Sequence, residues 1–247
     1  MFKSIKFKLC CTVFFAFSIL NYQHAKAQSY LWGISIGEAG LDRVNSVATD
    51  PVDGSIYLAG LFFDAIDCIP GSGTLVINAI HAQDGILIKF DANGNYQWAT
   101  HFGGNDAQSG VDIIVDDQQY ISVLVNENQD FAVYKFDKDG NADWYYSPTL
   151  ASSAYGRAMA LDTEGNTYIS GTYQDTIVFD NTFGSDTIIS TSFEDRFLVK
   201  INQNGHYIWS QSIGAHNCGI LEEQLFVADG YIYSAGMFHG GADFDPS

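Results

Sequence analysis

The fold is decided by three stretches that share one layout: DGILIKFDANGNYQW at 84–98, DFAVYKFDKDGNADW at 130–144 and DRFLVKINQNGHYIW at 195–209. In each stretch an Asp, a Lys and a Gly precede the Trp by 14, 9 and 4 residues. The first half is apolar and rich in β-branched or aromatic residues, and the Asn/Asp–Gly break is typical of a tight hairpin turn in which Gly takes a positive φ. The layout therefore predicts a repeated β-hairpin.

The repeat extends beyond each hairpin. An Asp follows three of the four Trp residues by 18 positions and the last by 20; these are Asp50, Asp116, Asp162 and Asp229. Next comes a Tyr-x-x-Gly motif at 57–60, 168–171 and 233–236, with 120–123 as a degenerate copy. We expect four strands per unit, in which A ends at the Asp, B carries Tyr-x-x-Gly, C carries the Lys and D carries the Trp.

Strand C selects the architecture because it is apolar on both faces. A sandwich strand alternates apolar and polar residues, since one of its faces meets water. A four-stranded antiparallel sheet covered on both sides by copies of itself is a propeller blade, whereas a parallel β-solenoid would have shorter coils. The sequence therefore predicts an all-β partial β-propeller of four-stranded antiparallel blades, with the solenoid as the alternative.

About 3.5 blades are expected in residues 28–247. They are an orphan D strand at 29–37, blade 1 at 44–103, blade 2 at 110–149, blade 3 at 155–213 and half of blade 4 at 221–247. This number is too small to close a ring. We therefore expect missing C-terminal blades of the same chain to complete it.

The N-terminus has the layout of a secretory signal. Three lysines within residues 1–8 precede an apolar run at 9–20, and Ala25-Lys26-Ala27 has the small residues of a cleavage site. The run is too short to span a bilayer, so we expect cleavage after Ala27 and a secreted or cell-surface protein without a transmembrane segment. An uncleaved anchor is the alternative. Cys68 and Cys218 would remain after cleavage, either bridged or as two free thiols.

Charge and composition exclude two classes of protein. With 47% apolar and 15% aromatic residues the chain can build a core, which excludes intrinsic disorder. Its 29 acidic residues against 11 Lys and Arg give a net charge of −18. Such a surface repels phosphate backbones, so nucleic acid is not an expected partner.

The repeated frame resembles the SBBP family, the β-propeller repeats of exported bacterial proteins. The residues that carry the resemblance are 84–91, 98–104 and 241–246, and the likeness covers 29–247. It implies a surface or secreted multi-blade protein, often from Bacteroidota and often with a type IX secretion sorting domain, which is not found within these 247 residues. The resemblance implies no catalytic residues. Val123 departs from the pattern by replacing the motif glycine.

The expected binding surface is the rim that displays the B–C and D–A loops. It holds the long segments 62–83, 174–194 and 239–247, and variable loops on a rigid scaffold commonly carry function. The candidate ligand-binding residues are Phe62, Phe63, Tyr173, Phe179 and Phe183. Aromatic rings among acids suit a glycan or a protein at the cell exterior. The sequence thus favours a non-enzymatic binding or adhesion scaffold; the alternatives are a polysaccharide lyase or hydrolase and a structural spacer.

No cofactor is predicted, and calcium is the metal that the acids permit. The candidate ligands are Asp67, Asp180, Asp243 and Asp245, which would otherwise bind loop amides. The acidic turn 137–143 resembles a calcium loop but has Gly at its fourth position rather than its sixth, so we interpret it as a turn.

Ser35 in the G-x-S-x-G string 33–37 is predicted within a strand rather than at a catalytic turn. The repeated Trp residues are expected to pack between blades, and the repeated lysines to reach solvent or an Asp.

Overall fold

The computed structural model describes residues 33–38, 40–69, 71, 73–181, 184–191, 193–213 and 223–236, with the backbone alone at 180, 181, 184 and 223. Regular structure in these residues is β-strand throughout. All the strands belong to one unit, Ile34–Ser247. In this described part, no helix is long and apolar enough to cross a bilayer.

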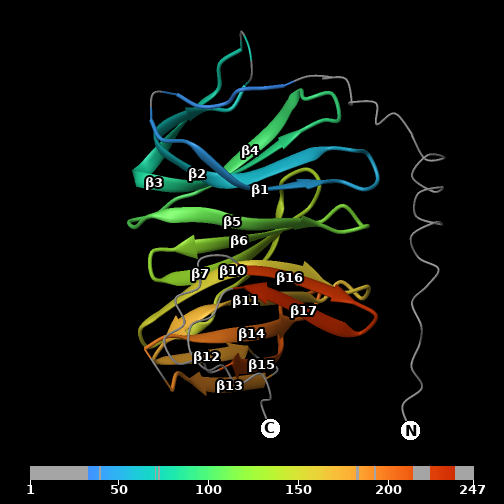
Figure 1. Cartoon of the computed structure of the whole chain (residues 1–247). Helices are drawn as coiled ribbons and strands as arrows, with labels where there is room; N and C mark the ends of the chain where they lie inside the picture. The colour runs from blue at the N-terminus through green and yellow to red at the C-terminus, as the bar shows by residue number, and fades with distance from the viewer. Residues whose placement is uncertain are drawn as a thin grey trace, which may run out of the picture. The chain divides into compact units, whose positions relative to one another are not determined.

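Three four-stranded antiparallel sheets carry the repeat, and a two-stranded sheet follows them (Figure 1). Sheet 1 consists of β1 (Arg43–Thr49), β2 (Ile56–Asp67), β3 (Val76–Phe90) and β4 (Tyr96–Phe102). Sheet 2 consists of β5 (Gln108–Val115), β6 (Ile121–Glu127), β7 (Asp130–Phe136) and β8 (Ala142–Tyr146). Sheet 3 consists of β10 (Ser153–Leu161), β11 (Thr167–Gln174), β14 (Asp195–Ile201) and β15 (Tyr207–Ile213). Sheet 4 consists of β16 (Glu223–Ala228) and β17 (Tyr231–Gly236).

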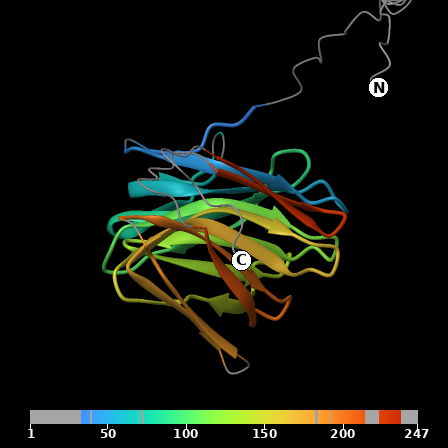
Figure 2. The same ribbon diagram turned by 60° about the horizontal axis from the view of Figure 1, so that its bottom comes forward.

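Successive sheets meet at their first strands. β1 contacts β5, β5 contacts β10, and β10 contacts β16 (Figure 2). Sheet 2 is covered on both faces: Val123 and Val125 of β6 lie in the cluster shared with sheet 1, whereas Leu124 between them lies in the cluster shared with sheet 3. All three are fully buried, and each burial stabilises the fold by about 1.5–3 kcal/mol. The described chain is thus an all-β partial propeller, as predicted.

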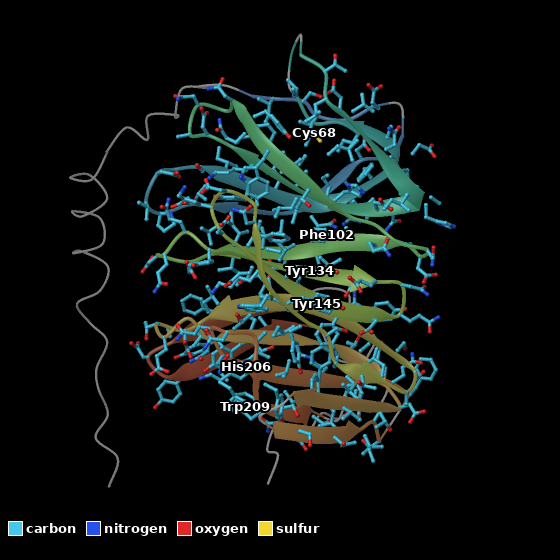
Figure 3. The ribbon with its side chains drawn as sticks, turned by 180° about the vertical axis from the view of Figure 1, so that it is seen from behind. Cys68, Phe102, Tyr134, Tyr145, His206 and Trp209 are labelled. Atoms are coloured by element: carbon cyan, nitrogen blue, oxygen red, sulfur yellow. The ribbon has the colours of Figure 1, made fainter. Side chains whose placement is uncertain are left out.

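A row of aromatic rings crosses the interface between sheets 1 and 2 (Figure 3). The ring centroids of Phe102 and Tyr134 are 4.8 Å apart, and those of Tyr134 and Tyr145 are 4.9 Å apart. The Tyr134 hydroxyl donates to Glu127 Oε1 at 2.5 Å. Burial, reinforced by Glu127, raises the pKa of Tyr134 far above its ordinary value. The phenol therefore remains a neutral hydrogen-bond donor inside the interface.

The C–D turns have the predicted conformation. Gly94, Gly140 and Gly205 have φ values of 82°, 86° and 78°, a region that is unfavourable for residues with a side chain. In the second turn, Asp137 Oδ1 accepts hydrogen bonds from the amides of Asp139 at 3.0 Å and Asn141 at 2.9 Å. The carboxylate that resembled a calcium ligand therefore caps the turn itself.

Two segments that we predicted as long loops are β-hairpins. The β2–β3 ladder continues past Phe63 to the pair Asp67–Val76, so most of 62–83 is strand. In 174–194, β12 (Thr176–Asn181) and β13 (Gly184–Ile189) form a hairpin to which β9 (Thr149–Leu150) adds a third strand. The prediction was wrong because backbone hydrogen bonds extend a hairpin wherever two flanking segments both accept the extended conformation.

The orphan strand predicted at 29–37 is not a strand in its described part. Residues 33–38 are irregular, and Gly37 has a φ of 127° that does not fit a strand. Its amide donates to the Asp67 carbonyl at 3.1 Å. Ser35 is exposed, and the described chain continues from this segment to strand β1 rather than to a helix. The structural context of a hydrolase nucleophile is therefore not present around Ser35.

Candidate functional site

In sheets 2 and 3, a buried or half-buried lysine on strand C lies against the turn between strands A and B. Lys135 Nζ lies 3.4 Å from Asp116 Oδ2, and Lys200 Nζ lies 3.0 Å from Asp162 Oδ2. This confirms the expected pairing with Asp for these two lysines. Lys89 differs, because its Nζ donates to the Lys138 carbonyl of sheet 2 at 2.9 Å. Each ammonium also lies over a tyrosine ring, at 4.8–5.2 Å from the centroid.

The tryptophans join one sheet to the C–D turn of the next. Trp98 Nε1 donates to the Lys138 carbonyl at 3.1 Å, and Trp144 Nε1 donates to the Gln203 carbonyl at 2.9 Å. A Cβ on Gly205 would lie 2.8 Å from the Trp144 ring. Glycine in this turn thus serves both the positive φ and the close approach of the indole. The expected packing of Trp between blades is confirmed for this pair of tryptophans.

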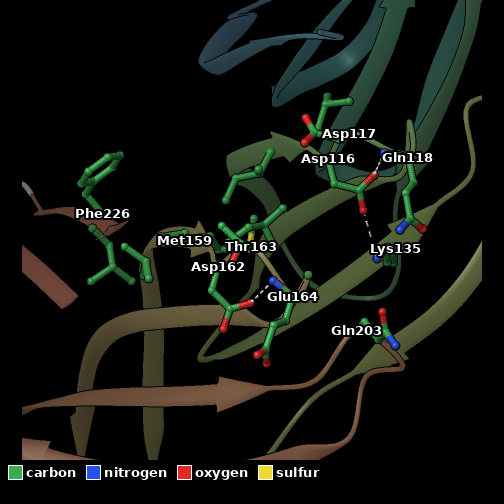
Figure 4. A pocket seen from close by; sticks show the side chains of 17 residues that line it. Asp116, Asp117, Gln118, Lys135, Met159, Asp162, Thr163, Glu164, Gln203 and Phe226 are labelled. Carbon is green, nitrogen blue, oxygen red and sulfur yellow. Dashed lines mark hydrogen bonds and ion pairs between the residues drawn. The ribbon is translucent and has the colours of Figure 1, made fainter. Parts of the chain in front are cut away.

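These contacts border the turn pocket, a space of about 490 Å³ lined by the A–B turns of sheets 2 and 3 and by β16 (Figure 4). Its acids are Asp116, Asp117, Asp162 and Glu164. Asp116 accepts from the Gln118 and Tyr120 amides, each at 2.9 Å, and Asp162 is bound in the same way. Burial opposes ionisation of Asp162, but Asn166 and Lys200 outweigh it and lower its pKa to about 2. Asp116 and Asp162 are thus committed to holding their turns and lysines.

A second pocket lies among the first strands of the four sheets, β1, β5, β10 and β16. A β-bulge that recurs in three of these strands shapes it. The A–B pairing shifts register at one equivalent place in each sheet, between Val44 and Ser46, between Gly110 and Asp112, and between Gly156 and Ala158. The extra residues are Asn45, Val111 and Arg157, each five positions before the strand's Asp. All three line a space of about 660 Å³, here called the bulge pocket, together with residues of β16 and β17. A bulge re-aims a side chain and is frequent beside binding sites.

The Tyr-x-x-Gly motif is explained by the bulge that it faces. Gly60 pairs with Val44 and Gly171 pairs with Gly156. A Cβ on Gly60 would lie 1.9 Å from the Arg43 carbonyl oxygen. In sheet 2 the residue in this register is Val125, not the predicted Val123. The degenerate copy at 120–123 was misaligned because the Lys135 partner on strand B is Ser122 rather than Tyr120.

One carboxylate joins three sheets beside the bulge pocket. Asp112 accepts hydrogen bonds from Ser46 Oγ of sheet 1 at 2.9 Å, from the Met159 amide of sheet 3 at 2.8 Å and from the Ile113 amide at 2.9 Å. Burial raises the pKa of Asp112, an effect that these hydrogen bonds partly oppose. Its acceptor sites face protein donors, so its role is to fix the first strands relative to one another.

Arg157 presents the pocket's positive charge. The guanidinium carbon lies 5.7 Å from the centroid of the Tyr155 ring. Its Nε is buried and has no hydrogen-bond acceptor among the described residues. Phe226 of β16 and Tyr233 of β17 line the same pocket and are 63% and 55% exposed. The bulge pocket is thus lined by one cation, whose buried Nε has no described acceptor, and by two aromatic rings of the last described sheet.

The aromatic rim predicted from the sequence is corrected by burial. Phe62, Tyr173 and Phe179 are fully buried or nearly so, which leaves their rings no face for a glycan. Phe62 packs with Ile66 under the β2–β3 hairpin. Tyr173 and Phe179 belong to the apolar cluster in which the β12–β13 hairpin packs against sheet 3. Phe63 is half-buried. Phe183 lies outside the described residues.

Of the four candidate metal ligands, only Asp67 has a described side chain. Asp67 accepts the amides of Ile69 at 3.0 Å and Leu75 at 2.9 Å, which close the hairpin tip and lower its pKa. This is the amide-binding alternative to calcium. The Asp180 side chain, Asp243 and Asp245 lie outside the described residues. Across the described ranges, no group of three His, Cys, Asp or Glu side chains is arranged to hold a metal ion.

Of the two cysteines that follow the signal-like segment, the structure describes Cys68. Cys68 is fully buried beneath the β2–β3 hairpin and has a free thiol. Burial, followed by the charges of Asp67 and Asp42, raises the pKa of this thiol to about 12. Cys218 lies outside the described residues. The thiol of Cys68 is thus protonated and shielded at neutral pH.

Comparison with known proteins bears on this repeated architecture. No protein-family model matches the chain. Over 221 residues the chain is 20% identical to an uncharacterized WD repeat-containing protein of Acanthamoeba polyphaga mimivirus. The chain is similar to a repeat protein. The match covers 85% of this chain and 13% of that protein, so the chain spans only a small part of the relative's length. The likeness agrees with a propeller-like repeat protein, which is a scaffold compatible with binding.

Sequence reasoning missed the bulge residues, although the repeat held a signal for them. They stand at a constant distance before the strand's Asp, and a Gly immediately precedes two of them, Val111 and Arg157. What the sequence alone did not reveal is that this position points to the space shared by the first strands.

Proposed function

We propose that this chain is an exported, non-enzymatic scaffold of the propeller type that binds a protein partner through the bulge pocket. The signal-like layout of residues 1–27 and the SBBP-like repeat support export to the cell surface or beyond. Similarity to a WD repeat-containing protein supports a scaffold. A glycan is the alternative ligand from the same exterior setting.

The observation that carries the proposal is the contrast between geometry and chemistry at the bulges. Three sheets have the same bulge at the same place, yet it presents Asn45 in one, Val111 in the next and Arg157 in the third. A purely packing role would favour similar residues at equivalent places, as in the repeated Trp and Lys positions. Different side chains converging on one pocket are typical of a surface that recognises a specific shape.

The chemistry of the pocket favours binding over hydrolysis or elimination. In the described lining of the bulge pocket, Asp112 is the one carboxylate, and three protein donors occupy it. Glycoside hydrolysis commonly needs two carboxyl groups in acid and base roles. The composition of this pocket therefore supports a binding scaffold rather than a polysaccharide-acting enzyme.

Two measurements test the proposal. Export is tested by expressing the full chain in a Gram-negative host with and without Phe15→Arg, which interrupts the apolar run; we expect the periplasmic fraction to fall sharply. Binding is tested on peptide and glycan arrays with Asn45→Trp, which obstructs the bulge pocket from an exposed position. The control is Val52→Trp, a 63% exposed site outside both pockets. Equal array binding by wild type and Asn45→Trp contradicts the proposed site.

A further inference from the structure

We propose that Asp84 and His101 form a proton-dependent clasp at the base of the β2–β3 hairpin, which holds the hairpin more tightly when the imidazole carries a proton. The clasp lies in sheet 1 and does not depend on the bulge pocket. A contact that recurs between sheets with altered chemistry carries this inference.

The hairpin is joined to sheet 1 through an irregular segment. Where the pairing of β2 with β3 shifts register, residues 79–82 lie opposite Asp64 alone. Asp64 has a φ of 56°, in the left-handed region. Asp84 Oδ2 accepts a hydrogen bond from the Ile80 amide at 3.0 Å and so bridges this segment. The outer part of the hairpin, residues 65–78, is therefore anchored to the sheet beside one carboxylate.

The Asp84 carboxylate is poorly compensated in the interior. Its side chain is fully buried, and its Oδ1 has no hydrogen-bond partner among the described residues. His101 Nε2 lies 3.7 Å from Asp84 Oδ2, and the His101 ring packs edge-on against Phe62 with 6.4 Å between the centroids. This N–O distance is beyond hydrogen-bond range, so a neutral imidazole stabilises the carboxylate little. The attraction of an imidazolium still acts at this distance and supplies the countercharge that the buried carboxylate needs.

The same place in sheets 2 and 3 is occupied by a residue that does not titrate. The third residue after the repeated Trp is His101 in sheet 1, Ser147 in sheet 2 and Ser212 in sheet 3. Ser147 forms a side-chain hydrogen bond to Asp130, the counterpart of Asp84. A hydroxyl can make this contact at any pH at which the carboxylate is ionised. Histidine instead gains or loses its proton between pH 5 and 8, so the contact in sheet 1 responds to pH in that range.

The neighbouring groups leave His101 as the source of this response. Cys68 and Tyr96 belong to the apolar cluster on the same face of sheet 1. Burial raises the pKa of both, to about 12 for the thiol, so both are neutral between pH 5 and 8. Two backbone amides lower the pKa of Asp67, which is therefore ionised throughout this range. The other charged or titratable side chains in the segments that border this face are Glu38, Asp42, Arg43, Asp64, His81 and Asp106.

The test is hydrogen–deuterium exchange of the full chain at pH 5.5 and pH 8.0, corrected for the intrinsic exchange rate. The amides of residues 65–78 should be at least about fivefold less protected at pH 8.0, relative to those of β14, because deprotonation removes the countercharge. His101→Ser gives sheet 1 the residue that sheet 2 has and should abolish this difference, and so should Asp84→Asn. The matched control is His81→Ser, which changes an exposed histidine of the irregular segment and should retain the difference.

The outcomes are specific to the clasp. Equal protection of the wild-type hairpin at both pH values overturns it, as does a pH difference that survives His101→Ser. Loss of the difference in His81→Ser assigns the response to the exposed histidine and also overturns the clasp. Thermal melting shows which variants are folded; if Asp84→Asn is not, His101→Ser decides alone, because it leaves Asp84 its hydrogen bond from Ile80. Failure of the clasp leaves the proposed binding function unaffected, since the binding arrays test that function separately.

Discussion

The two pockets among the first strands are built on opposite principles. Around the turn pocket, sheets 2 and 3 repeat one arrangement: an Asp caps the A–B turn, a Lys pairs with that Asp, and the C–D turn accepts a hydrogen bond from the Trp of the preceding sheet. The bulge pocket repeats a backbone shape but not its side chains. In a repeat protein, chemistry that recurs with the geometry is therefore structural, whereas chemistry that varies on constant geometry is where recognition is expected.

The largest expected effect comes from the glycine opposite a bulge. Gly171→Ala places a Cβ 2.1 Å from the Tyr155 carbonyl oxygen and 2.7 Å from the Phe197 ring. Both neighbours are held in place, so we expect a loss of roughly 3–5 kcal/mol in the free energy of unfolding, measured by denaturant titration. Gly71→Ala is the control, because its Cβ would meet nothing within 4 Å and only its positive φ is unfavourable. Similar losses for both variants would show that the bulge does not require close strand approach.

The Trp contact is expected to have the next largest effect. Trp144→Phe removes the indole donor to the Gln203 carbonyl and part of the surface that covers Gly205. The expected loss of unfolding free energy is about 1–2 kcal/mol. Trp209→Phe is the matched variant, since the described residues hold no C–D turn after sheet 3, and should cost less than half as much. An equal cost for the two would mean that the indoles stabilise their own sheets rather than the contact between sheets.

The acid–lysine pairs should show a defined pH dependence. The pKa of Asp162 is lowered from its ordinary 3.8 to about 2, so its ionised form stabilises the fold above pH 4. That contribution is lost as the pH falls from about 4 to about 2. Asp162→Asn should therefore be less stable than wild type by about 1 kcal/mol at pH 6, and the difference should shrink toward zero near pH 2. A difference that stays constant over this range contradicts a role for the carboxylate charge.

The smallest effect on stability is expected at Arg157. No ion pair of Arg157 is found among the described contacts, so Arg157→Gln should change the free energy of unfolding by less than about 0.5 kcal/mol. Lys135→Gln is the matched variant from the turn pocket and leaves Asp116 without its ion pair; we expect it to cost about 1–2 kcal/mol. The comparison between the pockets breaks down if Arg157→Gln proves the more damaging of the two.

Local chemistry explains how far the sequence predicted this fold. The four-stranded units and the turn glycines were predictable because a tight turn requires a glycine, such as Gly140, and burial on both faces requires consecutive apolar residues, such as those around Leu124. The same reasoning misaligned strand B of sheet 2, since a single Tyr120 gave no means of distinguishing a shorter turn from a substituted motif. It also took Phe62 and Phe179 for exposed rim residues, because an excursion from a repeat can be an open loop or a packed hairpin with its own small core. The bulge pocket could not be predicted from the sequence, because its three bulge residues are 46 or more positions apart and come together only when the sheets pack against one another.

The Trp contact also defines the unit in which such a chain can be lengthened or recombined. The indole belongs to one sheet and its carbonyl acceptor belongs to the turn of the following sheet. Cutting a gene between sheets would separate the two halves of every such contact at the junction. A transplanted segment that runs from one tryptophan to just before the next therefore carries both the indole and its carbonyl acceptor, while the loop chemistry that it brings remains free to differ.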